Sequence, residues 1–193
     1  MNDPVSHETL ALLAARRSVK PVFLTGPGPT RAQIETMLTL ASRVPDHGKL
    51  APWRFLAIEG DARVRLGETA LAIKLLDKPG LDEAQRAWEA KTFAHAPLVI
   101  GIVSRAAAHA KIPLWEQELS AGAVGMNLLI AAKALGFTGC WLTEWQAYDP
   151  RFRAALGLAE AERIAGFVHI GRAAAAIEDR PRPALADIVT WLS

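Results

Sequence analysis

Two arginine-rich segments near the ends of the chain could together bind a phosphate group. Arg16 and Arg17 are followed directly by Ser18, and Arg180 and Arg182 flank a proline near the C-terminus. A guanidinium presents a planar fork of donors that binds phosphate bidentately, and a hydroxyl can add a hydrogen bond. The alternative explanation is structural: cations at a helix end complement the helix dipole, and a charged terminal loop can simply be solvated.

A second group of residues could contact a planar ring. The segment Arg43-Val44-Pro45-Asp46-His47 contains a proline turn, Trp53 follows Pro52, and Trp141 lies in an apolar stretch. Arg and His can hydrogen-bond the polar edge of a ring, and an indole can pack on its face. Each of these residues also has a structural explanation, as part of a local turn or of the hydrophobic core.

Most signatures of catalysis by protein side chains are absent from the sequence. It has no Gly-x-Ser-x-Gly elbow, no Walker-type loop and no Gly-x-Gly-x-x-Gly fingerprint. The glycine-rich run 26–29 contains prolines, which lack the N–H groups that a phosphate would need. The five histidines show no ligand spacing with a carboxylate, so we expect no metal site. An enzyme that lacks a nucleophile motif and a metal motif often takes its chemistry from an organic cofactor.

The composition predicts one soluble domain over residues 1–193. The chain is 51% hydrophobic with a mean hydropathy of +0.14, which is sufficient for a sizeable core. The net charge is only +2 and its cations are scattered, so we expect no nucleic-acid partner. The most apolar stretch, Leu119 to Leu135, is too short and too polar for a membrane span. With a single cysteine, Cys140, and no signal peptide, we expect no disulfide framework and a cytoplasmic location.

Hydrophobic periodicity and cap residues predict the elements that must position these segments. Helices are expected from Asp3-Pro4 to about Arg17, from Thr30 (with Gln33 in a capping box) to Pro45, over 62–94 with a break at Pro79-Gly80, and over 114–135 and 149–157. Strands are expected over 55–59, 97–104, 138–143 and 164–170. The C-terminal residues from Pro181 to Trp191 are expected to form an extended arm.

Helices dominate this pattern and single strands recur between them, which indicates an α/β or α+β sandwich of unknown strand order. The predicted helix over 114–135 becomes apolar on all sides before Gly136 ends it. Such a helix is expected at the centre of the fold or at a subunit interface.

Taken in order along the chain, these segments resemble the nitroreductase family, and most closely its compact branch of short bacterial proteins. The resemblance covers nearly the whole chain and is carried by the stretches Arg16–Ser18, Ala41–His47, Ala51–Phe55, Pro113–Gly136, Gly136–Trp141 and Ile164–Gly171. Each motif is weak by itself, whereas the whole set in the family's order is specific.

The resemblance implies a single FMN-binding domain with an α+β fold, in which helices flank a central mixed or antiparallel sheet. It also implies an intertwined homodimer with FMN at the subunit interface. Carried over residue by residue, Arg16, Arg17 and Ser18 would bind the phosphate and ribityl region, and His47 would reach the flavin from the other subunit. Other positions matching the cofactor site are Arg43, Pro52, Trp53, Trp141, Leu142, Thr143, Arg180 and Arg182. A region assigned to nicotinamide nucleotide binding matches Ala131, Ala132, Lys133, Ala134, Leu135 and Gly136.

The charges and the departures from the family pattern both bear on the flavin. An FMN phosphate carries nearly two negative charges, so burying it requires cations, which Arg16, Arg17 and one of Arg180 or Arg182 would supply. Members commonly have Ser, Asn and Gln before Pro-Trp, where this chain has Gly48-Lys49-Leu50-Ala51. Leu142-Thr143 stands where the compact branch typically has Arg-Ser, which removes a cation near the flavin.

The reaction that the resemblance implies is a ping-pong hydride transfer from NADH or NADPH through flavin N5 to a small organic acceptor. The protein would contribute orientation and electrostatics. We expect His47 to position the flavin, although a histidine can also transfer a proton. Two alternatives stay open: a flavin-binding protein without efficient reductase activity, and an oxygen-dependent flavin enzyme.

Overall fold

The structure is a computed structural model that describes residues 4–192. Its α-helices are α1 (His7–Ala15), α2 (Arg31–Ala41), α3 (Asp61–Asp77), α4 (Glu83–Ala90), α5 (Leu114–Ala134), α6 (Pro150–Ala155) and α7 (Leu185–Ile188). Its strands are β1 (Leu24–Thr25), β2 (Trp53–Glu59), β3 (Leu98–Ser104), β4 (Thr138–Leu142) and β5 (Arg163–Ala173). Single 3-10 turns occur at η1 (Pro21–Phe23), η2 (His47–Lys49) and η3 (Trp145–Ala147).

The named strands pair antiparallel throughout, in the order β1-β5-β3-β2. Strand β4 also pairs with β5, on the edge opposite β3. The central strand β3 is buried at every position. Its residues Leu98 and Ile100 face one core cluster, whereas Val99 and Val103 face another. A strand that is covered on both faces needs no polar side, which is why its sequence is continuously apolar.

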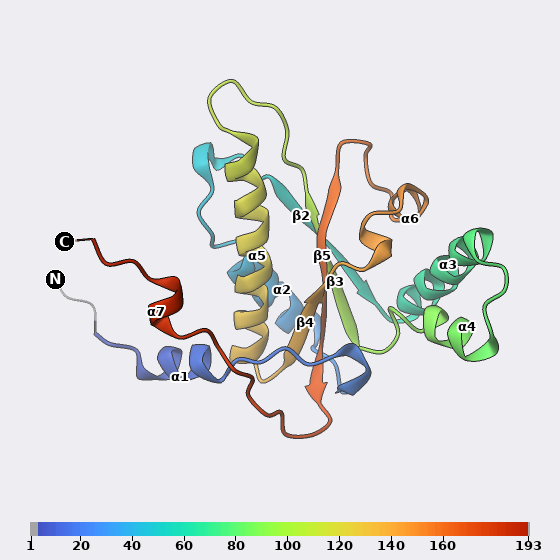
Figure 1. The fold of residues 1–193 in the computed structure, drawn as a ribbon, viewed down its shortest axis with the longest axis horizontal. Helices are drawn as coiled ribbons and strands as arrows, with labels where there is room; N and C mark the ends of the chain where they lie inside the picture. The colour runs from blue at the N-terminus through green and yellow to red at the C-terminus, as the bar shows by residue number, and fades with distance from the viewer. Residues whose placement is uncertain (1–3, 193) are drawn as a thin grey trace.

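Helices cover both faces of this sheet (Figure 1). On one face, α2 and α5 pack Met37 and Leu128 against β3 and β5. On the opposite face, α3 and α6 form the second core, where the ring of Phe93 contacts Phe152 and Phe167. The predicted α+β sandwich is confirmed, and its sheet is antiparallel.

Local hydrogen bonds determine where several helices begin. At α2, the Thr30 side chain accepts from the N–H of Gln33 (3.3 Å), and the Gln33 side chain accepts from the N–H of Thr30 (2.9 Å). Asp82 and Gln85 form the same capping box at α4. The carboxylate of Asp149 accepts from two backbone N–H groups in the first turn of α6. These side chains satisfy donors that have no partner within the helix, so these starts can be predicted from sequence.

Three expectations about the elements are wrong. The first helix begins at His7, because the hydroxyl of Ser6 accepts from a first-turn N–H; Pro4 is not helical, and Asp3 lies outside the described residues. The second helix ends at Ala41, before Pro45, and Asn127 of α5 donates to a carbonyl in its last turn. The expected extended C-terminal arm contains the short helix α7.

The terminal helices α1 and α7 bury none of their side chains. Leu10 on α1 is 57% exposed, and Leu185 and Ile188 on α7 are 70% and 63% exposed. Both helices lie on the same side of the molecule, beyond α5 (Figure 1). Because most helical stability in proteins comes from packing an apolar face, these helices need a further surface to cover them.

Candidate functional site

The segment from Arg16 to Lys20 runs extended along the outer edge of β4. Ser18 forms a parallel bridge with the strand, and the N–H of Val19 donates to a β4 carbonyl over 3.2 Å. Successive residues of an extended chain point to opposite sides, so Arg16, Ser18 and Lys20 share one side and Arg17 takes the other. The predicted Arg-Arg-Ser cluster is therefore divided between two surroundings.

Arg17 is held by the C-terminal arm. Its Nε lies 3.1 Å from Oδ1 of Asp179 and also donates to the carbonyl of Glu178. Nη2 of Arg182 lies 3.1 Å from the same carboxylate oxygen, and the exposed Arg180 donates its backbone N–H to this carboxylate. That backbone hydrogen bond and the two guanidiniums hold the pKa of Asp179 below its usual value. The two predicted basic segments thus meet, and they meet at an acidic side chain.

Arg17 also borders a cavity of about 500 Å³ that is rich in cations, with Lys133, Gly136 and Arg172 in its lining. Lys133 and Gly136 belong to the segment predicted to bind the nicotinamide nucleotide. The other residues of that segment lie elsewhere: Ala131 and Ala132 are buried, Leu135 packs against the core, and Ala134 is exposed. The buried alanines present no surface to a nucleotide in this chain, whereas Lys133 and Gly136 border the cavity.

The other side of the Arg16–Lys20 segment borders a cavity of about 450 Å³, here called the β4-edge cavity. Its lining includes Ser18 and Lys20 from the segment, Cys140, Trp141, Leu142 and Glu144 from β4 and its continuation, Trp88 and His95 near α4, and His169 from β5. Ser18, Trp141 and Leu142 are therefore the predicted site residues that the structure brings together here. A cavity of this size with apolar walls and a few polar groups is typical of a cofactor site.

His95 and His169 carry unsatisfied polar atoms in the lining of this cavity. Nε2 of His95 and Nδ1 of His169 are buried and have no hydrogen-bond partner within residues 4–192. His169 is only 3% exposed, and its ring stacks near Phe93. Burial lowers the pKa of His169 to about 4 and also lowers that of His95, so both rings are neutral at pH 7. A ligand or ordered water would supply the missing hydrogen bonds.

The chain leaves β4 in a strained conformation. Glu144 has φ +46° and ψ −174°, a region that glycine occupies almost alone. Burial raises the pKa of the Glu144 carboxyl, and the nearby carboxylate of Glu89 raises it further. Thr143, which was predicted to line the cofactor, is half-buried just before it. Cys140 is buried, and burial raises its pKa to about 11, so its thiol is protonated at neutral pH.

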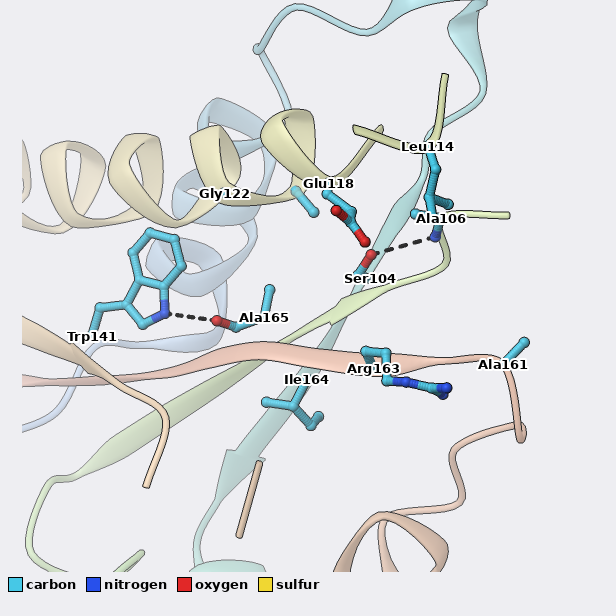
Figure 2. Close-up of a pocket in the computed structure, with 11 residues that line it drawn as sticks. Ser104, Ala106, Leu114, Glu118, Gly122, Trp141, Ala161, Arg163, Ile164 and Ala165 are labelled. Carbon is cyan, nitrogen blue, oxygen red and sulfur yellow. Dashed lines mark hydrogen bonds between the residues drawn. The ribbon is translucent and has the colours of Figure 1, made fainter. Parts of the chain in front are cut away.

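Trp141 packs between α5 and β5 (Figure 2). Its Nε1 donates to the carbonyl of Ala165 over 3.0 Å, at a bulge where the β3 register skips that residue. A Cβ on Gly166 would lie 1.7 Å from Nε1, and one on Gly125 would lie 2.5 Å from the indole ring. The indole also borders a second cavity of about 460 Å³, into which Glu118 points (Figure 2). The absence of a side chain at Gly125 and Gly166 leaves the space that the indole fills, so Trp141 is mainly a core residue.

Pro52 and Trp53 are part of the core as well. Pro52 is buried, and the indole of Trp53 packs against the α2–α5 core. Nε1 of Trp53 donates to Oγ of Ser120 (3.2 Å), and this hydroxyl donates to the carbonyl of Pro45 (2.7 Å). These contacts join β2, α5 and the turn after α2, and the structural explanation of both residues is sufficient.

Arg43 and His47 lie in the exposed connection between α2 and β2. Nδ1 of His47 is 2.7 Å from Oε2 of Glu116 in the first turn of α5, and the carbonyl of Arg43 accepts from Asn127 over 2.9 Å. Asp46 accepts from two backbone N–H groups of the following loop, which fixes its shape. Neither Arg43 nor His47 lines the β4-edge cavity of its own chain.

Comparison with known proteins decides the family. The model of the nitroreductase family matches residues 13–172, which is most of the chain. The chain belongs to the nitroreductase family. A curated relative from Escherichia coli (strain K12), named "Putative NAD(P)H nitroreductase YdjA", is 38% identical over 168 residues, covering 85% of this chain and 87% of the relative. The sequence-based assignment to this family of oxidoreductases is confirmed.

Solved structures of nitroreductase-like proteins share the fold. A nitroreductase-like family protein from Bacillus cereus has a TM-score of 0.80 at 23% identity, and the match covers 100% of this chain and 98% of that one. A nitroreductase with bound FMN from Bacteroides fragilis NCTC 9343 has a TM-score of 0.72 at 22% identity, covering 97% and 100% of the two chains.

The structure of this nitroreductase-family chain adds residues that sequence reasoning missed. Lys20 could have been found, because it continues the alternation of Arg16 and Ser18 by one step. Glu144 and His169 gave no local signal, since the strain of one and the burial of the other depend on contacts distant in sequence.

Residues 4–192 contain neither a metal-binding cluster nor a helix suited to cross a membrane. Within this range, no group of three or more His, Cys, Asp or Glu side chains is arranged to hold a metal ion. The helices described there include none with the length and apolar character needed to cross a membrane.

Proposed function

We propose that this nitroreductase-family chain is an FMN-dependent oxidoreductase that transfers hydride from NADH or NADPH to a small organic acceptor. The observation that carries the proposal is the β4-edge cavity, which Ser18 and Lys20 line, with Arg16 on the same side of the extended segment two residues before Ser18. The Bacteroides fragilis relative was solved with FMN, and the Escherichia coli relative is named for NAD(P)H. Both names support the choice of cofactor and electron donor.

The residues of the β4-edge cavity fit a flavin. A flavin ring needs apolar walls together with hydrogen-bond partners at its polar edge, and its phosphate needs cations. Leu142 and Trp88 supply apolar surface, and the unsatisfied nitrogens of His95 and His169 supply hydrogen-bonding capacity. The cavity volume of about 450 Å³ lies within the range typical of ligand sites.

The chain's own residues would divide the work of binding. Arg16, Ser18 and Lys20 would hold the phosphate and other polar groups, and Leu142 and Thr143 would border the ring. When bound, FMN would supply the two-electron chemistry. Donor and acceptor would use the same opening in turn, which gives ping-pong kinetics. The protein's contribution would be orientation and exclusion of water, without a side chain as acid or base.

The phosphates of the donor nucleotide would find cations in the neighbouring cavity. Lys133 and Arg172 border that cavity together with Arg17, whose charge is already shared with Asp179. Phosphate is bound best by several cations at once, so we assign this cavity to the nicotinamide nucleotide.

A second copy of the chain would complete the site. The uncovered apolar side chains include Leu10 and Leu185 on the terminal helices and Trp115 and Leu119 on α5, and they suit a homodimer interface. Arg43 and His47 would then serve the flavin bound to the other subunit. The hydrogen bond with Glu116 holds His47 in one orientation, which favours a positioning role over proton transfer.

The test is an absorption spectrum of the purified protein, reconstituted with FMN and then mixed anaerobically with NADPH or NADH. We expect flavin absorbance that bleaches on addition of at least one donor. A matched pair of variants locates the site: Arg16→Ala should weaken FMN binding at least tenfold, whereas Arg31→Ala on the far end of α2 should not.

The other outcomes separate the alternatives. Flavin absorbance that persists with both donors would favour a flavin-binding protein without efficient reductase activity. Product formation that stops without oxygen would favour an oxygen-dependent flavin enzyme. Absence of FMN binding would overturn the proposal.

A further inference from the structure

Glu144 is a charged residue that the fold keeps in a conformation suited to glycine. Its φ of +46° and ψ of −174° place Cβ where it crowds the backbone. Glycine would adopt these angles freely, so the carboxylate side chain is retained against a conformational cost. Such outliers concentrate at functional sites, where surrounding structure holds them in place.

The structure that holds Glu144 is the turn that follows it. The carboxylate of Glu89, itself buried, accepts from Nε1 of Trp145 (2.8 Å) and from Nε2 of Gln146 (3.1 Å). Ala147, the next residue, is buried in the core. With β4 paired on one side and this turn fixed on the other, the backbone at Glu144 has no freedom to relax.

The side chain of Glu144 has no structural partner. Within residues 4–192, its carboxylate makes no hydrogen bond and no ion pair, whereas it does border the β4-edge cavity. The neighbouring cation Lys74 is directed elsewhere: its Nζ lies 3.9 Å from Glu89 and over the ring of Trp145. A strained residue without an internal hydrogen bond or ion pair is therefore presented to whatever enters the cavity.

The charges around the cavity leave this carboxylate poorly compensated. Lys20 is the cation in the cavity lining, and the proposed function assigns it to the cofactor. His95 and His169 are neutral at pH 7 because burial lowers the pKa of each. Glu89 behind the turn and its ion-pair partner Lys74 act on Glu144 in opposite directions, and the negative charge of Glu89 has the larger effect. A ligand beside Glu144 thus meets a negative potential.

We propose that Glu144 selects the acceptor by charge, so that the β4-edge cavity disfavours anionic acceptors and accepts neutral or cationic ones. This inference rests on the proposed function, because the acceptor would enter through the opening of the cavity that holds the flavin. The acceptor class it names is an uncharged or cationic small aromatic compound with a reducible group.

The test compares two acceptors of nearly equal shape, 4-nitrobenzoate and 4-nitrobenzamide, at pH 8, which is far above the ordinary pKa of a glutamate side chain. The FMN-loaded enzyme, its Glu144→Gln and Glu144→Lys variants and the control Glu68→Gln on α3 are measured with both compounds. We expect Glu144→Gln to raise the ratio of kcat/KM for the anion to that for the amide roughly fivefold. Glu144→Lys should raise it further, and the effect should shrink in high salt.

A binding measurement separates failure of this inference from failure of the proposed function. Titration calorimetry gives the affinity of each compound for the FMN-loaded protein without turnover, and the same change of ratio is expected. Unchanged ratios in both variants, or an equal change in Glu68→Gln, would overturn the role of Glu144 even in an active enzyme. If the enzyme is inactive but the Glu144 variants still change the ratio of the two affinities, the role of Glu144 stands and the reductase assignment is overturned.

Discussion

His169 couples the stability of the protein to pH through a single buried ring. Its pKa in the folded chain is about 4, below that of an unfolded histidine, because burial disfavours the charged form. The unfolded chain therefore binds more protons between about pH 4 and 6.5, and stability falls as the pH is lowered through this range. Above about pH 6.5 the contribution of His169 no longer changes.

Replacing His169 with Phe should flatten this dependence. Phenylalanine fills a similar volume beside Phe93 and has no proton to gain, so the loss of stability between pH 7 and pH 4.5 should shrink by roughly 2 kcal/mol. Urea denaturation at both pH values measures the change. His7→Gln, on the exposed face of α1, is the control. An unchanged pH dependence in His169→Phe would show that His169 is not the titrating group.

The strain at Glu144 predicts that a smaller side chain stabilises the fold. Glycine at this position relieves a cost of about 1–3 kcal/mol and gives back up to about 1 kcal/mol in the entropy of the unfolded chain. We therefore expect Glu144→Gly to raise the free energy of unfolding by about 1 kcal/mol, measured by chemical denaturation. Glu144→Gln keeps a Cβ and should leave stability within about 0.5 kcal/mol. Destabilisation by glycine would contradict the strain.

At the scale of elements, close approach between β5, β4 and α5 depends on glycine at position 166. A Cβ on Gly166 would fall inside the indole of Trp141, which α5 holds from the opposite side. We expect Gly166→Ala to destabilise the protein by about 3 kcal/mol or more, because the ring cannot move without displacing the helix. The melting temperature and the soluble yield report the effect. Gly80→Ala, where the added Cβ meets nothing within 4 Å, should be close to neutral.

Elements with local signals could be predicted from the sequence, and those that depend on distant partners could not. The capping boxes at Thr30 and Asp82 act within one turn, so the starts of α2 and α4 can be predicted from the local sequence. The two-residue strand β1 exists only because it pairs with the end of β5. The sheet order likewise depends on contacts between segments far apart in the chain.

The same distinction applies to the site. The residue types at Ser18 and Leu142 could be assigned from ordered motifs, and the structure places both at one cavity. The direction of Arg17 could not, because it depends on Asp179 at the other end of the chain. The sequence leaves Trp53 and Trp141 open between ring stacking and core packing. Both pack against the α2–α5 core, and Trp141 also borders the β4-edge cavity.

At the scale of the whole molecule, the uncovered terminal helices predict a dimer. Leu185→Asp with Ile188→Asp puts charges on the exposed apolar face of α7 and should disfavour its burial by a second chain. Analytical ultracentrifugation at about 10 μM should show a dimer for the parent and a shift toward monomer for the variant. The matched control is Leu76→Asp, on α3, whose side chain is 74% exposed. A parent that sediments as a monomer would contradict the dimer.

The single cysteine gives this molecule a built-in reporter of its cavity. Cys140 is 4% exposed on the wall of the β4-edge cavity, and its pKa of about 11 leaves little thiolate at pH 8. An aromatic disulfide reagent should therefore label the native protein far more slowly than the unfolded chain, at a rate set by how often the wall opens. Added FMN should slow labelling further if it occupies this cavity, so the rate of labelling, with the flavin absorbance subtracted, reports both occupancy and opening without any engineered probe.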